Sequence, residues 1–394
     1  MKLVVYEWTA FTYNDLYEAL SQEGISFKIA RIPHSPRKQN ERMDFITKFE
    51  EFLKANPCDA VFSINFFDCI AEVCHKNDTM YIAWTYDSPS MGGSINSHYL
   101  PTNRIFLFDS AELEKHKKLG KSNLYHLNLA VDTKRYNRIR TTPMEQVKYM
   151  SQISFVGQLY ETQMQEIMAT LEPYSAAYLN ALADIQMRNY NMNLMEPLIT
   201  DGLVEFIKTP EFVEKMKPLA EKLGLQNRVG KEVVRHLLLR RATNRERILL
   251  LAMLSKYYQV KLFSIDKNDI LENVIFGGMV DYEKDMPKVF KNSKINLNIT
   301  LRSIEKGITL RCLDVMACHG FLMTNYQEDL FTELEDGKDM VVYESIEEAL
   351  EKADFYLKHD KLRQEIANNG YKKMKDCFNY HRQLEKIWSI TGLK

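Results

Sequence analysis

The sequence predicts an α/β protein with two parallel-sheet domains. The first observation is the length of 394 residues, which exceeds what one hydrophobic core usually organises. The second is that short β-branched or aromatic runs alternate with helical patterns in both the N-terminal and the C-terminal part of the chain. The third is a middle stretch with helical patterns alone, which indicates a helical insertion in the second domain.

The composition is that of a soluble globular protein. Hydrophobic residues make up 45% of the chain and charged residues 27%, a balance that excludes a disordered or a membrane-embedded chain. The net charge of -1 provides no overall field that would attract nucleic acid. We therefore expect no nucleic-acid partner.

The cysteines and the start of the chain indicate the compartment. Six cysteines are present and none forms a C-x-x-C pair, which favours reduced thiols in the cytosol. The apolar run in MKLVVYEWTAF is too short for a signal peptide or a membrane span. A cytoplasmic location is the resulting expectation.

The first domain is expected over residues 1–145. Helical spacing of apolar residues predicts helices over 14–22 and 42–54. No G-x-G-x-x-G occurs, so a dinucleotide oxidoreductase lacks its main support. The expected strands cover residues 3–6, 26–29, 60–64, 80–84, 105–108 and 124–126.

The end of the expected strand 80–84 and the loop after it carry candidate site residues. Trp84 and Tyr86 offer aromatic faces on which a sugar ring could stack. Asp87 is a candidate catalytic base, because a carboxylate can take a proton from an attacking hydroxyl. The alternative is that Asp87 and Ser88 only make a turn ahead of Pro89.

The second domain is expected over residues 146–377, and a last helix over 378–394. The domain opens with ISFVGQLY, a strand that ends in Gly157. A glycine allows phosphate to approach the backbone closely, although a single glycine after a strand is also a common turn residue.

The helical insertion is expected over residues 161–241. The run 231–247 is basic around an apolar stripe, which suits weak association with an anionic membrane surface or binding of an anionic acceptor. The alternative is a solvated face whose apolar side packs on the domain. A new helix over 243–258 is then expected, because Thr243 and Glu246 have the spacing of a capping box.

Residues 298–327 hold the main candidate site. A strand over 294–299 leads into a loop, a helix begins near Thr309, and a second strand covers 321–325. Ligands of open parallel sheets bind beyond the carboxyl ends of the strands, where loop amides and helix N-termini can hold an anion. The polar or flexible positions of this stretch are Asn298, Arg302, Lys306, Gly307, Thr309, Asn325 and Gln327.

Arg311 and Asp314 lie three residues apart in the expected helix, so both side chains leave the same face. A guanidinium suits phosphate oxygens, and a short carboxylate suits a pair of ribose hydroxyls. Together they predict binding of a sugar nucleotide. The alternative is a surface ion pair along the helix, which would contribute little.

The stretch that includes LDVMACHG resembles the C-terminal half of group 1 glycosyltransferases of the GT-B fold, and is most similar to their spore-maturation-protein type. The group carries a motif like E-G-F-G-x-x-x-x-E-A-M-A-x-G. Asp314 takes the position of the last Glu, which holds the donor ribose, and Gly307 that of the glycine after the first Glu. Lys306 replaces that first Glu and His319 replaces a glycine, which are the two departures.

The resemblance implies two Rossmann-like domains and a final helix that crosses back to the first domain. It places Tyr282, which opens an expected helix over 282–292, beside the nucleotide base. Arg302, Lys306 and Arg311 would neutralise the leaving diphosphate, and Asn325 and Gln327 would contact the donor sugar. The expected donor is a UDP- or GDP-linked sugar, and the acceptor is an unidentified protein, glycan or lipid-linked group.

No D-x-D sequence occurs, so paired carboxylates for a divalent metal are not indicated. We expect metal-independent transfer, with no cofactor beyond the sugar nucleotide as co-substrate. Two alternatives remain open. One is a sugar-nucleotide epimerase of the same architecture, and the other is a degenerate transferase that binds a nucleotide sugar or a partner without turnover.

Overall fold

The computed structural model describes residues 1–10, 12–36, 38, 40–90, 95–120, 122–223, 225 and 228–393. Contacts within the chain divide it into two compact units. The N-terminal unit comprises Met1–Ala130, Pro218–Arg228 and Tyr380–Lys394. The C-terminal unit comprises Val131–Lys217 and Val229–Asn379.

The N-terminal unit contains a six-stranded parallel sheet with the order β2-β1-β3-β4-β5-β6. Strands β3, β4 and β6 have the bounds expected from the sequence, because the β-branched and aromatic runs end at turn residues there. The strands are β1 (Lys2–Tyr6), β2 (Ser26–Ala30), β3 (Ala60–Ile64), β4 (Met80–Trp84), β5 (Asn103–Leu107) and β6 (Leu124–His126).

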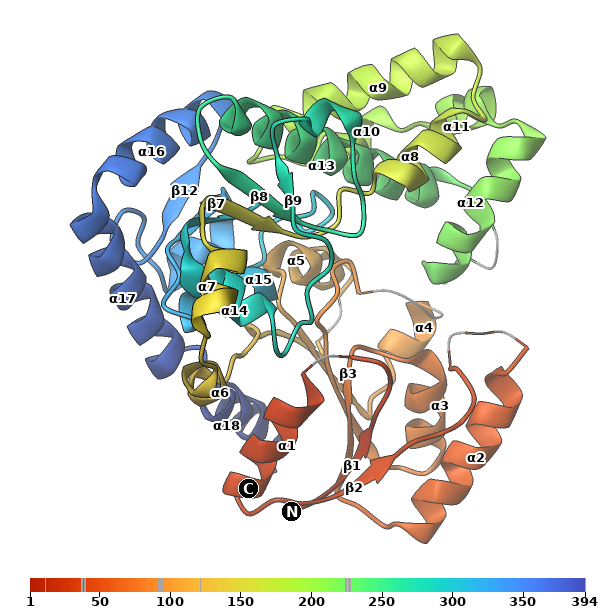
Figure 1. Ribbon diagram of the computed structural model, residues 1–394. Helices are drawn as coiled ribbons and strands as arrows, with labels where there is room; N and C mark the ends of the chain where they lie inside the picture. Colours follow the sequence, from red (N-terminus) through yellow and green to blue (C-terminus); the bar gives the residue numbers. More distant parts are fainter. Residues whose placement is uncertain are drawn as a thin grey trace. The chain divides into compact units, whose positions relative to one another are not determined.

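Helices cover both faces of this sheet (Figure 1). Side chains alternate along β1, so Leu3 and Val5 pack on the side of α1 and α18, whereas Val4 and Tyr6 pack on the side of α2 and α3. The helices of this unit are α1 (Tyr13–Gln22), α2 (Arg42–Ala55), α3 (Asp68–Lys76), α4 (Ile95–His98), α5 (Ser110–Lys118) and α18 (Tyr380–Thr391).

The C-terminal unit contains a second six-stranded parallel sheet with the order β12-β11-β10-β7-β8-β9. The first strand in sequence, β7, lies between β8 and β10, so the strand order reverses between β7 and β10. Ligands of such sheets bind at this switch point. The strands are β7 (Ser151–Val156), β8 (Val260–Phe263), β9 (Ile275–Phe276), β10 (Ser293–Asn298), β11 (Leu322–Asn325) and β12 (Val341–Tyr343).

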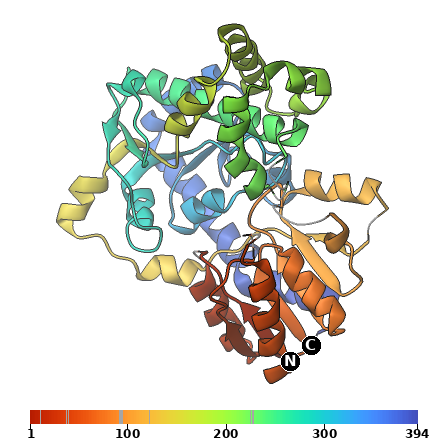
Figure 2. The same ribbon diagram turned by 90° about the vertical axis from the view of Figure 1, so that its right-hand side faces the viewer.

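The described segments between β7 and β8 form helices and no strand, which confirms the predicted helical insertion (Figures 1 and 2). The prediction of a helix start at Thr243 was wrong. Its Oγ1 donates to the Leu239 carbonyl 2.9 Å away, so the residue lies inside a long helix and caps nothing. These helices are α8 (Glu161–Met168), α9 (Pro173–Met187), α10 (Met195–Leu198), α11 (Asp201–Ile207), α12 (Pro210–Lys222) and α13 (Lys231–Ser255).

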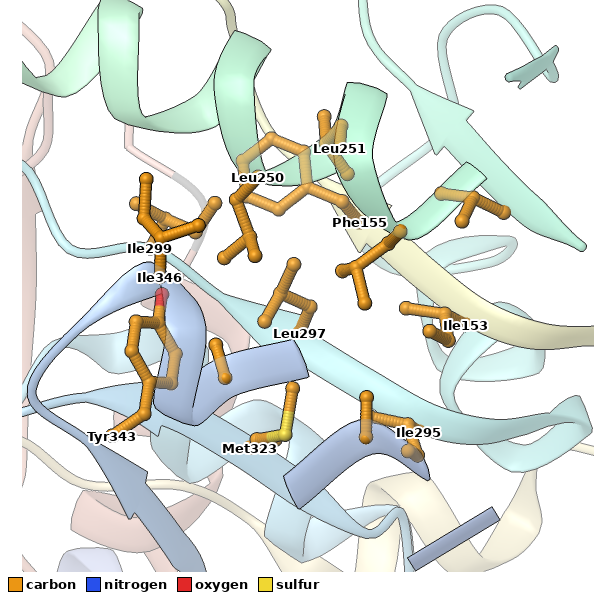
Figure 3. Close-up of a cluster of buried hydrophobic side chains, with 14 of the residues drawn as sticks. Ile153, Phe155, Leu250, Leu251, Ile295, Leu297, Ile299, Met323, Tyr343 and Ile346 are labelled. Atoms are coloured by element: carbon orange, nitrogen blue, oxygen red, sulfur yellow. The ribbon is translucent and has the colours of Figure 1, made fainter. Parts of the chain in front are cut away.

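One apolar core joins α13 to the second sheet (Figure 3). Leu250 and Leu251 of α13 pack with Phe155 of β7 and Leu297 of β10, and all are buried. The C-terminal helices α16 (Ile346–Lys358) and α17 (Asp360–Asp376) contribute to the same cluster. The end of β7 and the end of β10 are therefore anchored to one helix.

The remaining helices of the C-terminal unit are α6 (Thr133–Arg138), α7 (Pro143–Tyr149), α14 (Met286–Asn292) and α15 (Leu310–Ala317). The expected helix start at Tyr282 was wrong, since α14 begins at Met286. The side chain of Asp281 accepts from the amides of Glu283 and Lys284, which forms a turn before the helix. Within the described part of the chain, no helix is apolar over a length that could cross a membrane.

Candidate functional site

The carboxylate of Asp314 lies in α15 and is only 1% exposed. Its Oδ1 accepts hydrogen bonds from the hydroxyls of Tyr136, at 2.6 Å, and Tyr282, at 3.0 Å. Its Oδ2 lies 3.7 Å from Nη1 of Arg311. We call Asp314, Arg311, Tyr136, Tyr282 and the neighbouring Arg135 the Asp314 cluster.

The electrostatics of the Asp314 cluster are those of a carboxylate held by neutral hydroxyls. Burial raises the pKa of Asp314, and Arg311 and the two tyrosine hydroxyls oppose that rise. Burial and the nearby Asp314 raise the pKa of Tyr136 and of Tyr282 well above their usual range, so both remain donors. The guanidinium of Arg135 lies 4.2 Å from the ring centre of Tyr136 and 5.8 Å from that of Tyr282. A carboxylate that already holds two hydroxyl groups has the chemistry needed to bind a diol.

The structure changes the expected role of Tyr282 and adds Tyr136. Tyr282 lies in the turn before α14, and its hydroxyl is directed at Asp314. Tyr136 donates to the same oxygen across a separation of 178 residues. Sequence reasoning missed Tyr136 because no local pattern reports a contact over such a distance.

Arg302 points into the core, and its predicted contact with a diphosphate stays a prediction. Its side chain is 4% exposed, and Nη2 lies 2.8 Å from a carboxylate oxygen of the fully buried Glu246. The same nitrogen donates to the Met187 carbonyl at 3.0 Å, and the guanidinium lies 3.9 Å from the ring centre of Tyr190. Arg302 therefore neutralises a buried carboxylate that sequence reasoning also missed.

Arg247 of α13 connects the loops that follow β7 and β10. Its Nη2 donates to the Ile299 carbonyl at 2.6 Å, and its Nη1 donates to the Gln158 carbonyl. Nearby, the side-chain amide of Asn244 donates to the Leu159 carbonyl at 2.9 Å. These contacts fix the two loops at the switch point of the sheet.

The other basic side chains of the run 231–247 also have partners within the C-terminal unit. This arrangement is that of a helix packed on its own domain, and the membrane association stays a prediction. The pairs are Lys231 with Asp201, Arg235 with Glu232, Arg240 with Gln163, Arg241 with Asn180, and Arg245 with Asp184.

The loop after β7 already binds an internal carboxylate. The amide of Gly157 donates to the Phe263 carbonyl at 3.0 Å. In the same turn, the amides of Leu159 and Tyr160 donate to Oδ2 of Asp266 at 3.0 and 2.9 Å. The loop thus has the geometry of an anion site, with a side chain of the protein in the anion's place.

Asn298 and Asn325 join the ends of β10 and β11, and their expected donor contacts stay a prediction. Both are buried. The Asn298 amide donates to the hydroxyls of Thr300 and Thr324, each at 3.0 Å. Oδ1 of Asn325 accepts from the Thr300 amide at 2.7 Å. These side chains stiffen the edge of the sheet from which the site is built.

Gln327 and Lys306 remain candidates for ligand contact. Gln327 is 3% exposed, and its Oε1 has no hydrogen-bond partner within the described residues. A buried acceptor without a partner is costly, so a ligand or water is expected to satisfy it. Lys306 lies 3.1 Å from Glu328 and remains partly exposed. Gly307 is buried beside it, and Thr309 is the N-cap of α15.

In the N-terminal unit, the structure separates the roles expected for Trp84, Tyr86 and Asp87. Trp84 is 0% exposed, which leaves no face of its ring open for the predicted stacking on a sugar. Its ring packs edge-on against Tyr86, with ring centres 5.3 Å apart, and Tyr86 is half-buried. Asp87 is exposed, and its Oδ2 accepts from the Asn65 amide at 2.8 Å. Asp87 therefore remains accessible to an acceptor.

Residues 235–389 match a family model described as "Glycosyl transferase-like". The sequence matches none of the curated proteins. The spore-maturation type therefore stays a prediction.

Several solved structures have a similar fold. HepE from Anabaena, in complex with UDP and glucose, is 10% identical, with 100% of this chain and 99% of that chain covered and a TM-score of 0.53. Sucrose-phosphate synthase from Thermosynechococcus elongatus is 9% identical, with 99% and 98% covered and a TM-score of 0.57. BGT of phage T4, in complex with its UDP-glucose substrate, is 10% identical, with 100% and 98% covered and a TM-score of 0.50.

At such low identity, these likenesses establish the fold alone. They agree with the two six-stranded parallel sheets and the helices described above. The protein therefore has the GT-B fold, and its C-terminal part is similar to glycosyl transferases.

Proposed function

We propose that the protein is a glycosyltransferase that moves a sugar from a UDP- or GDP-linked donor to an acceptor. The observation that carries the proposal is the Asp314 cluster, in which a buried carboxylate holds two hydroxyl groups beside a guanidinium. The cluster lies on the helix that follows β10, next to the switch point of the sheet. The matching family model, which includes this helix, supports the proposal.

The donor would bind by exchange of hydroxyl groups at Asp314. The hydroxyl of Tyr282 comes from a turn, whereas Tyr136 is 0% exposed within α6. The Tyr282 hydroxyl is therefore the one that a ribose hydroxyl would replace. Arg311 has a side chain that is 28% exposed, so its guanidinium can reach a phosphate.

The leaving diphosphate needs positive charge that is already in place. Arg311 and Lys306 are partly exposed cations of the candidate site that could supply it. Gln327 would direct its free Oε1 at a donor hydroxyl. We propose that transfer needs no metal, and that Asp87 removes the proton from the acceptor hydroxyl.

A thermal-shift panel of UDP, GDP, ADP and their sugar conjugates tests the proposal. We expect one nucleotide to raise the unfolding temperature, because a ligand at a hundred times its dissociation constant adds about 2.7 kcal/mol of stability. The sugar conjugate of that nucleotide should shift the temperature as well. The addition of MgCl₂ and of EDTA in parallel samples tests whether binding depends on a metal.

The outcomes separate the alternatives. If no nucleotide shifts the unfolding temperature, the candidate site has been misinterpreted. If a sugar nucleotide binds and is converted without an acceptor, the protein is an epimerase. If it binds and no acceptor promotes release of the nucleoside diphosphate, the protein is a binding protein of the same fold.

A further inference from the structure

The N-terminal unit contains a second candidate site, a cavity of about 560 Å³ beyond the carboxyl ends of β1 and β2. We call it the β1–β2 pocket. Every described residue that lines it belongs to the N-terminal unit, whereas the Asp314 cluster belongs to the C-terminal unit. The residues used in the argument are Glu7, Trp8, Arg31, His34, Lys38 and Glu41.

Trp8 gives the β1–β2 pocket a fixed apolar surface. The indole Nε1 donates to the Ile64 carbonyl at 2.7 Å, and the ring packs edge-on against Phe67 with centres 5.8 Å apart. Trp8 is half-buried, whereas Trp84 and Trp388 are buried. A ring that is held in place and partly open is suited to contact with the C–H face of a sugar.

Two ion pairs line the same pocket. Arg31 binds Glu7 with two nitrogens, one of them 3.1 Å from Oε2, and Glu7 also accepts from the Tyr17 hydroxyl at 2.6 Å. Lys38 lies 3.0 Å from Glu41. The side chains of Arg31 and Lys38 are 68% and 62% exposed, so both can still contact a ligand.

This alternation of charges selects the kind of ligand. The described lining residues include both carboxylates and cations. Glu7 and Glu41 would repel an anionic ligand, and Arg31 and Lys38 would repel a cationic one. His34 also lines the pocket, and its Nε2 lies 3.0 Å from the ammonium of Lys48. A hydroxyl group both donates and accepts, so it can bind to a carboxylate and a guanidinium at once. A polyhydroxylated, uncharged molecule therefore fits best.

We infer that the β1–β2 pocket binds a neutral saccharide, with a sugar ring on Trp8 and hydroxyl groups on the Glu7–Arg31 pair. Under the proposed function this saccharide is the acceptor. The acceptor role rests on the proposed function, whereas binding at the pocket does not. Binding itself requires the N-terminal unit alone. A volume of about 560 Å³ lies in the usual range for small-molecule sites.

Tryptophan fluorescence of the full chain tests the inference. The ligands are neutral tetrasaccharides (maltotetraose, cellotetraose and mannotetraose), acidic tetragalacturonate and cationic chitosan tetramer. We expect at least one neutral ligand to change the emission in a saturable way at millimolar concentration or below. The Trp8→Phe variant keeps an aromatic ring in the pocket. It should lose this signal, because the two tryptophans that remain, Trp84 and Trp388, are buried and do not line the pocket.

The second measurement is calorimetry of saccharide binding by variants in which one charged side chain of the pocket is neutralised. Glu7→Gln leaves Arg31 without its carboxylate, so neutral binding should weaken about tenfold or more, and tetragalacturonate should gain affinity. Arg31→Gln should shift preference toward the chitosan tetramer. Glu50→Gln is the matched control, because it breaks surface pairs with Lys54 and Lys76 outside the pocket.

Preference of the wild-type protein for a charged saccharide would overturn the inference, and so would absence of binding across the neutral panel. Equal effects of Glu7→Gln and Glu50→Gln would do the same. The nucleotide panel reports separately on the proposed function. Binding of a neutral saccharide without binding of any nucleotide would support the inference about the β1–β2 pocket and contradict the proposed glycosyltransferase function.

Discussion

Replacement of Arg302 by Met is expected to lower the free energy of unfolding by about 3–5 kcal/mol. The substitution removes the guanidinium 2.8 Å from Glu246 and leaves a fully buried carboxylate without its cation. Burial raises the pKa of Glu246, and Arg302 opposes that rise. Urea unfolding followed by circular dichroism measures the effect.

Two further variants show whether the loss comes from the buried pair. Glu246→Gln combined with Arg302→Met should recover much of the stability, since no unpaired buried charge remains. Arg311→Met should cost about 1 kcal/mol or less, because its side chain is 28% exposed and 3.7 Å from Asp314. If Arg302→Met unfolds like Arg311→Met and instead loses nucleotide binding, Arg302 contacts the ligand after all.

Replacement of Asp87 by Asn is expected to lower turnover by about 10²–10⁴-fold, the usual contribution of a general base. Asn keeps the size of the side chain and can still contact Asn65, but it cannot accept the proton. Release of the nucleoside diphosphate in the presence of an acceptor measures turnover. Calorimetry should show unchanged donor binding, because Asp87 lies in the N-terminal unit.

The control for this variant is Asp44→Asn, which changes an exposed carboxylate on α2. It should leave turnover at the wild-type value. Asn65→Ala should cause a smaller loss than Asp87→Asn, since Asn65 holds the carboxylate of Asp87 and the amides of Tyr86 and Asp87 but takes no proton. Full activity of Asp87→Asn would contradict a role as general base and leave Asp87 as a residue of the turn before Pro89.

Most of the fold could be predicted from the sequence because its signals are local. The runs that became β3 and β4 are buried strands bounded by turn residues, and parallel order follows from the helices between them. β12, with three residues, was missed, although β6 of the same length was predicted. Thr243 and Glu246 have the spacing of a helix start. Both lie inside α13, because packing of this long helix on the sheet stabilises it across these positions.

The candidate site was less predictable because burial of polar groups depends on distant residues. Asp314 could be identified from its spacing to Arg311 and from the resemblance around it. Arg302 was expected in a loop that faces a ligand, and Glu246 of α13 holds its side chain inside. Trp84, at the end of an expected strand, was expected to offer its ring to a sugar, whereas the ring fills the core against Tyr86 and Tyr380.

The most direct test of the account is calorimetric titration of the nucleotide selected by the thermal-shift panel into the wild-type protein, Asp314→Asn and Tyr282→Phe. Asn still accepts from Tyr136, so the fold should persist, and loss of the carboxylate should weaken binding by about 1–3 kcal/mol. Tyr282→Phe removes the hydroxyl that occupies Oδ1 and should bind as tightly as the wild type or more tightly. Unchanged affinity of Asp314→Asn would contradict a donor site at Asp314.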